Sequence, residues 1–263
     1  MLDEPTLKVE LRGKVLVLTL NRPDRLNALH RPMQHALEAQ YRRAAADPAI
    51  RAIVITGEGR AFCSGADVGG LKSAAEENSD PAKVIVPKFT NRMAGIYVPT
   101  IVAINGVCAG AGLHFVADGD IVIASEAASF VDSHVNVGQV TALEPIGLMR
   151  KASLSTVLRM VILGKGERLN AAKALEEGLV SEVVPAERLL ERAMELADLA
   201  CAGSPAAIEA SLKAVWESYE LPLSKAYKNG FDILIRHRAH PDAVEGPAAF
   251  LAKRDPVWTS PDS

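Results

Sequence analysis

The chain carries Asn105-Gly106-Val107-Cys108-Ala109-Gly110-Ala111-Gly112 directly after an apolar, strand-like run, Thr100 to Ile104. A second stretch of small residues, Arg60-Ala61-Phe62-Cys63-Ser64-Gly65-Ala66-Asp67-Val68, follows another such run, Ala52 to Thr56. Small residues after a strand let a ligand approach the main chain, and N–H groups at a helix start are free to bind negative charge. Two such turns can converge on one oxygen as an oxyanion hole, or they can serve only to pack strands tightly against helices.

The elements around these two stretches alternate between strand and helix up to about residue 185 and are mostly helical beyond it. The pattern predicts a hairpin over 7–11 and 15–20, a helix over 31–46, strands over 52–56, 100–104 and 121–124, and helices over 81–98 and 110–117. Further helices are predicted over about 144–162, 170–177, 187–202, 205–219, 222–239 and 241–252, with one strand over 180–184. The sequence therefore predicts an α/β half followed by a helical tail.

The composition is that of an ordinary folded protein, with 263 residues, 49% apolar side chains and a formal charge of −3. This apolar content disfavours disorder, and the slight acidic excess argues against nucleic acid as a partner. Three widely spaced cysteines offer no disulfide framework, and the N-terminus lacks an apolar signal core. Residues 93–117 hold no charged side chain, but Pro99 and several glycines interrupt them, so no membrane span is expected. We expect a cytoplasmic protein.

Four common catalytic signatures do not occur anywhere in the sequence. There is no phosphate-binding G-x-x-x-x-G-K-[ST], no G-x-G-x-x-G after a strand, no H-E-x-x-H and no G-x-S-x-G. Nucleotide hydrolysis, a Rossmann dinucleotide site, zincin chemistry and the hydrolases with a nucleophile elbow therefore lose support.

Several motifs, taken in order, resemble the enoyl-CoA hydratase/isomerase (crotonase) family. They are Leu20-Asn21-Arg22-Pro23 with Leu26-Asn27-Ala28-Leu29, Ala61-Phe62-Cys63-Ser64-Gly65-Ala66-Asp67, Ile104-Asn105-Gly106 with Gly110-Ala111-Gly112, Ala171 to Val180, and Glu245-Gly246 with Ala249 to Pro256. The likeness spans almost the whole chain. It implies an α/β fold with a crotonase-like spiral of ββα units over residues 1–200. It also implies a helical C-terminal trimerisation region over 201–263, and a homotrimer or a dimer of trimers.

The resemblance also implies a ligand and a site. The substrate is expected to be an acyl-CoA thioester, with coenzyme A entering as part of the substrate, no separate cofactor and no metal. The N–H groups of Ala66 and Ala111 fall at the two oxyanion-hole positions, flanked by Gly65, Asp67, Val68 and Gly110 as substrate contacts. Alanine at 111 keeps the N–H, although its β-carbon would strain a backbone of positive φ. Coenzyme A is expected near Arg25 and Ala28, with Phe250 and Lys253 beside the adenine, either from the same subunit or from a neighbour.

The sequence departs from the family at its acid/base positions. Family hydratases use two glutamates there, and this chain has His114 and His134 instead. Imidazole is competent as an acid or a base near neutral pH, but each histidine could equally be a hydrogen-bonded structural residue. Asp132, two residues before His134, is expected to lie on the same face of a strand and to orient the imidazole or act as a base itself. Glu144, in a stretch that borders the acyl pocket, either enters the site or only favours a helix N-terminus.

We therefore predict an acyl-CoA lyase that hydrates a 2-enoyl-CoA, or catalyses the reverse dehydration, through a thioester enolate. The predicted catalytic groups are Ala66, Ala111, His114 and His134, and the predicted substrate contacts include Asp132 and Glu144. Two alternatives remain on the same fold. One is an enoyl-CoA isomerase, or a hydrolase of thioesters or C–C bonds, that uses the histidine pair. The other is a CoA-binding protein without turnover, because both expected glutamates are missing.

Overall fold

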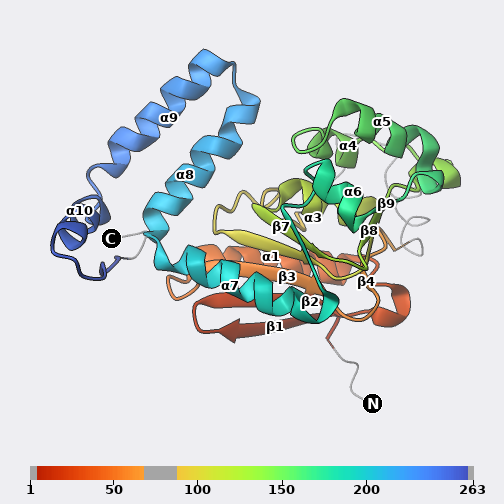
Figure 1. The fold of residues 1–263 in the computed structure, drawn as a ribbon, viewed down its shortest axis with the longest axis horizontal. Helices are drawn as coiled ribbons and strands as arrows, with labels where there is room; N and C mark the ends of the chain where they lie inside the picture. The colour runs from red at the N-terminus through yellow and green to blue at the C-terminus, as the bar shows by residue number, and fades with distance from the viewer. Residues whose placement is uncertain (1–4, 68–87, 260–263) are drawn as a thin grey trace.

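The computed structural model describes residues 5–67 and 88–259, which form two β-sheets surrounded by helices (Figure 1). The larger sheet has the strand order β1-β2-β3-β5-β7-β10, and only its first pair is antiparallel. Its strands are β1 (Leu7–Arg12), β2 (Val15–Leu20), β3 (Ala52–Gly57), β5 (Thr100–Ile104), β7 (Ile121–Ser125) and β10 (Glu182–Val184). The predicted hairpin and the predicted strands over 52–56, 100–104, 121–124 and 180–184 are thus confirmed.

The second sheet contains four strands of two or three residues each, in the order β4-β6-β8-β9. These strands are β4 (Ala61–Cys63), β6 (Val107–Ala109), β8 (Ser129–Val131) and β9 (Leu169–Asn170). β4, β6 and β8 follow β3, β5 and β7 after short turns, so the same two-strand step is repeated along the chain. This repeat supplies the two-strand part of the spiral of ββα units that the resemblance implies. None of these short strands was expected from the sequence.

Helices cover both faces of the larger sheet. α1 (Arg31–Ala46) buries Met33, Leu37 and Tyr41 in the same cluster as Leu16 and Leu18 of β2. The alternate residues of β2, Val15 and Val17, pack in a second cluster with α7 (Leu189–Ala202), which lies along the other face (Figure 1). Alternation along a strand sends successive side chains to opposite faces, so two helices are needed to bury the apolar side chains on both faces of β2.

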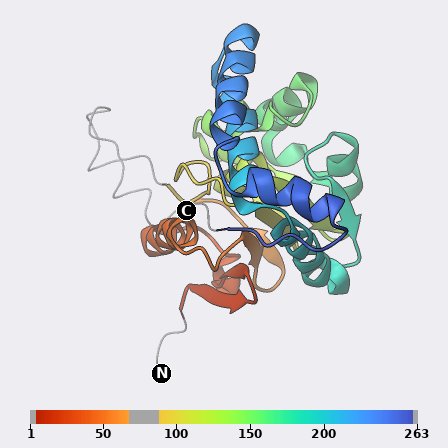
Figure 2. The same cartoon turned by 90° about the vertical axis from the view of Figure 1, so that its left-hand side faces the viewer.

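Three helices at the C-terminus extend away from the sheets (Figures 1 and 2). α8 (Pro205–Glu217) and α9 (Leu223–His237) form an antiparallel pair, and α10 (Asp242–Leu251) lies beside the base of α8. Trp216 Nε1 joins α8 to the core by donating to Asp120 Oδ1 at 2.8 Å. The predicted helical tail is confirmed, whereas the division at residues 200 and 201 and the trimer stay predictions.

Two predicted helices differ from the structure. In the helix predicted over 81–98, residues 88–98 form turns and loop instead, and residues 81–87 lie outside the described part of the chain. The helix predicted over 144–162 is two helices, α4 (Leu143–Leu148) and α5 (Leu154–Leu163). The side chain of Ser153 accepts from the N–H of Thr156 and so caps a new helix start in the middle of the expected one.

The remaining described helices are short, and several of them carry the site. They are α3 (Leu113–Asp118), α6 (Ala171–Glu176) and the 3₁₀ turns η1 (Pro23–Arg25), η3 (Gly110–Gly112), η4 (His134–Val137), η5 (Gly164–Gly166), η6 (Ala186–Arg188) and η7 (Ser218–Glu220). None of the helices in residues 5–67 and 88–259 has the length and apolar content required to cross a bilayer.

Candidate active site

The first turn of the site is held by a single parallel β-bridge between Leu29 and Ala66. Leu29 N donates to Gly65 O at 2.8 Å, and Asp67 N donates to Leu29 O at 2.9 Å. In such a bridge the two hydrogen bonds go to the neighbours of Ala66, so the N–H of Ala66 itself points to the opposite side. This N–H has no acceptor within the described part of the chain. It is therefore free to bind a ligand oxygen.

The second turn begins where β6 ends at Ala109 and continues as η3, Gly110–Gly112. The N–H of Ala111 lies in the first turn of this helix, where main-chain donors have no helical acceptor, and no acceptor for it occurs among the described residues. The positive φ of this turn, +49°, falls on Gly110 and not on Ala111. The strain that alanine would suffer at positive φ is therefore avoided.

The two turns lie against each other. A β-carbon added to Gly65 would lie 3.5 Å from the amide nitrogen of Ala111 and 3.3 Å from the carbonyl oxygen of Ala109. Gly65 also has φ +107°, which L side chains rarely adopt. Glycine at 65 thus allows the turn that carries Ala66 to approach the turn that carries Ala111. The structure thus brings together the two turns whose N–H groups the resemblance predicted as a pair.

Three ionisable side chains from three elements meet beside these turns. His114 comes from α3, His134 from the start of η4, and Glu144 from the first turn of α4. Glu144 Oε1 lies 3.3 Å from His114 Nε2 and 4.0 Å from His134 Nε2. The side chains of His114 and Glu144 are about one-tenth exposed, and that of His134 is about one-quarter exposed. A carboxylate therefore sits between the two imidazoles that replace the expected glutamates.

The histidine cluster is adjacent to the second turn. A β-carbon added to Gly110 would lie 3.4 Å from Cε1 and 3.8 Å from Nε2 of His134. The imidazole of His134 is thus in van der Waals reach of the main chain that carries the Ala111 N–H.

Asp132 contacts His134, but not for the reason expected from the sequence. β8 ends at Val131 and His134 begins a 3₁₀ turn, so the two residues do not share a strand face. Instead, Asp132 Oδ1 accepts from the main-chain N–H of His134 at 3.1 Å and lies 2.7 Å from its ring Nδ1. A hydrogen bond from a main-chain N–H to the side-chain carboxylate two residues earlier closes a common local turn. The orienting contact predicted for Asp132 is present, and it arises from this turn.

The pKa of His134 is raised, whereas the pKa values of Glu144 and Asp132 are lowered. The hydrogen bond to Asp132 raises the pKa of His134, and partial burial opposes this. Burial raises the pKa of Glu144, but the hydrogen bond from His114 and a main-chain N–H outweigh burial, so the net shift is downward. Burial likewise raises the pKa of Asp132, yet the hydrogen bonds from His134 and Thr141 leave it lowered. Near neutral pH both carboxylates are ionised, and His134 holds its proton more strongly than a free imidazole.

Two side chains at the site were not singled out from the sequence. Phe89 packs edge-on against His114 with ring centroids 5.5 Å apart, and Thr141 donates its hydroxyl to Asp132 Oδ2 at 2.5 Å. Both lie on irregular segments, where neither helical nor strand periodicity indicates which way a side chain points. A buried aromatic residue beside an imidazole leaves no signal at a fixed sequence spacing.

The other predicted residues divide into those near the site and those far from it. Arg25 and Ala28 adjoin the first turn, since Ser64 Oγ donates to Arg25 O at 3.4 Å and Leu29 bridges Ala66. Asp67 pairs with Arg22 at 2.9 Å. Phe250 lies on α10 and is 83% exposed, and Lys253 follows two residues after this helix ends. In this chain α10 lies apart from α3 and α4, which carry site residues (Figure 1). Val68 lies outside the described residues.

Neither a thiol nor a clustered metal site adds to this chemistry in the described residues. Burial raises the pKa of Cys63, beside the first turn, to about 12, so its thiolate is scarce near neutral pH. Among residues 5–67 and 88–259 no three histidine, cysteine, aspartate or glutamate side chains are placed to hold a metal ion. The groups with suitable chemistry are thus the imidazole–carboxylate cluster and the two main-chain N–H groups.

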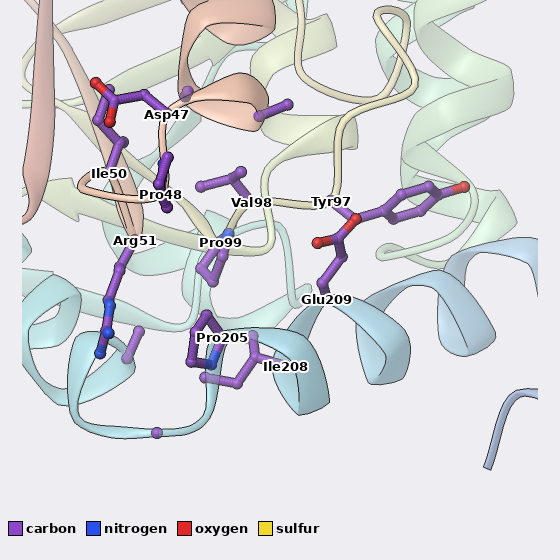
Figure 3. Close-up of a pocket in the computed structure, with 14 residues that line it drawn as sticks. Asp47, Pro48, Ile50, Arg51, Tyr97, Val98, Pro99, Pro205, Ile208 and Glu209 are labelled. Atoms are coloured by element: carbon purple, nitrogen blue, oxygen red, sulfur yellow. The ribbon is translucent and has the colours of Figure 1, made fainter. Parts of the chain in front are cut away.

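A separate cavity lies at the joint between the core and the C-terminal helices (Figure 3). It is lined by the end of α1, the loop around Pro48, the segment Tyr97–Pro99 and the start of α8 with Pro205 and Ile208. It shares no residue with the histidine cluster or with the two turns, and its lining offers no paired imidazole and carboxylate. We therefore assign the candidate active site to the turns and the cluster.

Comparison with known proteins identifies the family of the chain. The family model for enoyl-CoA hydratase/isomerase matches residues 10–261. The chain belongs to the enoyl-CoA hydratase/isomerase family. Its fold is the crotonase fold: the crystal structure of an enoyl-CoA hydratase/isomerase from Mycobacterium paratuberculosis superposes with a TM-score of 0.89 at 40% identity, covering 97% of this chain and 98% of that one.

Curated relatives in this family are named for hydratases of acyl-CoA thioesters. Enoyl-CoA hydratase EchA19 of Mycobacterium tuberculosis is 32% identical over 266 residues, which cover 96% of each chain. The 2,3-dehydroadipyl-CoA hydratase of Escherichia coli is 34% identical over 253 residues, covering 95% of this chain and 97% of the relative. The chain is an enoyl-CoA hydratase-like member of the family, and its candidate site holds the cluster formed by His114, His134 and Glu144.

Proposed function

We propose that the chain hydrates a 2-enoyl-CoA thioester, or dehydrates the corresponding 3-hydroxyacyl-CoA, at the site built by the two turns. The observation that carries this proposal is Glu144, whose carboxylate lies 3.3 Å from His114 and 4.0 Å from His134. A base and an acid are thereby available beside two free main-chain N–H groups, although neither glutamate expected from the resemblance is present. The hydratase names of the curated relatives support the same reaction class.

The N–H groups of Ala66 and Ala111 would hold the thioester oxygen. When water adds to Cβ of the enoyl group, the electron pair of the C=C bond moves toward the carbonyl, which becomes an enolate oxygen. Preorganised donors stabilise such developing charge by about 2.7–4 kcal/mol each. Because each donor is held by the bridge at Leu29 or by the start of η3, little reorganisation accompanies the reaction.

Proton transfer would be divided between Glu144 and His134. Glu144, ionised near neutral pH, takes a proton from the water as the water oxygen bonds to Cβ. His134, whose pKa is raised by Asp132, gives its proton to Cα of the enolate. The proton on Glu144 then returns to His134 through a water that bridges the 4.0 Å between Glu144 Oε1 and His134 Nε2, so one water is consumed by the substrate and both groups are restored. His114 fixes the position of the carboxylate from the other side.

Binding of the CoA portion would involve Arg25 and Ala28 beside the first turn. Phe250 and Lys253 would contribute from a neighbouring subunit, because in their own chain they lie on and just after α10, which is remote from the site (Figure 1). A homotrimer or a dimer of trimers would supply such a neighbour. The exposed apolar side chains of α9 and α10 support an assembled state, since contiguous exposed apolar surface usually marks a contact surface.

The test is incubation of the purified chain with crotonyl-CoA while the absorbance of the enoyl thioester is followed. The proposal predicts loss of that absorbance and formation of 3-hydroxybutyryl-CoA, identified by mass from the addition of one water. An unchanged spectrum with crotonyl-CoA and with longer and dicarboxylic enoyl-CoA substrates contradicts the proposal.

One observation also favours hydrolysis of a C–C bond in a β-dicarbonyl compound. Asp132 and His134 form an aspartate–imidazole pair at 2.7 Å, an arrangement suited to activating water for attack on a ketone carbonyl. The N–H groups would then hold the enolate that leaves when the C–C bond breaks. Formation of a new carboxylic acid from a β-diketone, with no reaction of crotonyl-CoA, would select this reaction over hydration.

A further inference from the structure

Thr141 lies between η4 and α4 and is the second partner of the buried carboxylate of Asp132. Its hydroxyl donates to Asp132 Oδ2 at 2.5 Å, while Oδ1 of the same carboxylate receives the main-chain N–H and ring Nδ1 of His134 at 3.1 Å and 2.7 Å. The carboxylate is only 3% exposed. Both of its oxygens are therefore committed within the protein, one to Thr141 and one to His134.

This arrangement leaves only one orientation for the carboxylate. Rotation about its side-chain torsion would break the bond to Thr141 or one of the two bonds to His134. A carboxylate at Nδ1 requires a hydrogen on that nitrogen, so neutral His134 carries its proton there and leaves Nε2 unprotonated. Nε2 is also the atom that lies 4.0 Å from Glu144.

We propose that Thr141 is a positioning residue, which holds Asp132 so that neutral His134 keeps its proton on Nδ1 and directs Nε2 toward Glu144 for proton transfer. This inference rests on the proposed function for its effect on turnover. The tautomer itself, however, is a property of the chain without substrate. Thr141 does not touch the reacting atoms and acts only through Asp132.

The charged and titratable groups that face His134 come from three elements. Asp132 follows β8, Glu144 lies on α4, and His114 on α3 contacts the same oxygen of Glu144. The main chain of η3 at Gly110 lies beside the ring, since a β-carbon added there would be 3.4 Å from Cε1 of His134, but it carries no charge. Among the described contacts, Asp132 is the only partner of His134 Nδ1. Loss of the Thr141 hydroxyl would release Asp132 and should therefore change the protonation of Nδ1.

The experiment compares Thr141→Val with Thr141→Ser. Valine keeps the shape of threonine without the hydroxyl, and serine keeps the hydroxyl. The ring nitrogen shifts of ¹⁵N-labelled histidine report the tautomer of neutral His134, assigned with a His134→Asn variant. We expect wild type and Thr141→Ser to be protonated on Nδ1 and Thr141→Val to be a mixture of the two tautomers. We also expect kcat for enoyl-CoA hydration to fall about tenfold in Thr141→Val with KM unchanged, as for a lost hydrogen bond to a charged group.

A second pair of variants tests whether Thr141 acts through Asp132. Asp132→Asn should favour protonation of His134 on Nε2, because an amide can donate to Nδ1. The double variant Asp132→Asn with Thr141→Val should lose no more kcat than Asp132→Asn alone. Additive losses would overturn the inference, and so would an unchanged Nδ1 tautomer in Thr141→Val.

The outcomes separate this inference from the proposed function. One outcome is that Thr141→Val shows a mixture of the two His134 tautomers while the wild-type chain hydrates no enoyl-CoA. That outcome would support the positioning role of Thr141 and reject the hydratase function. The opposite outcome is an active wild type in which His134 has the same tautomer as in Thr141→Val and Thr141→Ser. That outcome would support the hydratase function and reject the positioning role. Matching thermal unfolding midpoints of Thr141→Val and Thr141→Ser would show that a change in tautomer is not caused by partial unfolding.

Discussion

At the residue scale, the site keeps a carboxylate although both glutamates expected from the family are absent. Glu144 reaches the position between the imidazoles from α4, ten residues beyond His134. Its pKa is lowered and that of His134 is raised, which is the opposite of what two isolated groups in an apolar pocket would show. In the proposed mechanism the cluster therefore divides the acid and base roles between unlike groups.

Replacing Glu144 by glutamine tests the proposed base. Glu144→Gln keeps the shape and a hydrogen-bonding oxygen beside His114 but cannot take a proton from water. We expect kcat for hydration to fall by about 10²–10⁴-fold, the usual worth of general base catalysis, with KM changed little. Glu126→Gln, at an exposed turn between β7 and β8, is the matched control and should keep full activity. Equal activity of the two variants would remove Glu144 from the mechanism.

The pH dependence of kcat/KM follows from the directions of the two shifts. The proposed mechanism needs Glu144 ionised and His134 protonated. Because the pKa of Glu144 lies below its ordinary 4.5 and that of His134 above its ordinary 6.5, the profile should be a bell with a plateau between these values. Asp132→Asn removes the group that raises the pKa of His134, so the basic limb should move to lower pH. A basic limb that stays in place would contradict the assignment of His134 as the acid.

At the element scale, the long apolar strands and amphipathic helices were predictable, and the turns that build the site were only partly so. β2, β3 and β5 have continuous apolar sequences, and α1 places Met33 and Leu37 four residues apart. β4, β6 and β8 are three residues long, too short for any period to be read, and their pairing depends on contacts distant in sequence. The contact of Asp132 with His134 was expected, but from a strand geometry that the chain does not adopt.

Gly65 provides a test of the approach between the two turns. Gly65→Ala would add a β-carbon 3.3 Å from Ala109 O at φ +107°, at a cost of about 1–3 kcal/mol in unfolding free energy, and would push the turns apart. Gly13→Ala is the matched control, since Gly13 has φ +60° but open space around it in the β1–β2 turn. We expect both variants to lose thermal stability but only Gly65→Ala to lose kcat. Full turnover by Gly65→Ala would show that the approach is not needed.

At the scale of the whole molecule, the C-terminal helices present apolar side chains that this chain alone does not cover. Leu223, Tyr227 and Phe231 recur every four residues on α9 and are 70%, 73% and 61% exposed. The spacing puts them on one face of the helix. The core with its site is held to this region through Trp216 and Asp120. A site that needs Phe250 and Lys253 from a neighbour would couple assembly to substrate binding.

A charge on that face of α9 tests this coupling. Phe231→Glu should convert an assembly of at least three times the 28.0 kDa chain mass to smaller species in light scattering, and should raise KM for acyl-CoA more than it lowers kcat. Lys225→Glu adds an acidic side chain at an exposed position on the opposite side of α9, and it should leave the mass and KM unchanged. A monomeric wild type, or a trimeric Phe231→Glu variant with normal KM, would reject the coupling.

The most direct test of the account is a crystal structure of the chain with an unreactive acyl-CoA bound. The account predicts the thioester oxygen about 2.7–3.1 Å from both amide nitrogens, Ala66 N and Ala111 N, with Cα and Cβ of the acyl group facing Glu144 and His134. A thioester oxygen turned away from these two nitrogens, or an acyl group bound elsewhere on the chain, would contradict it.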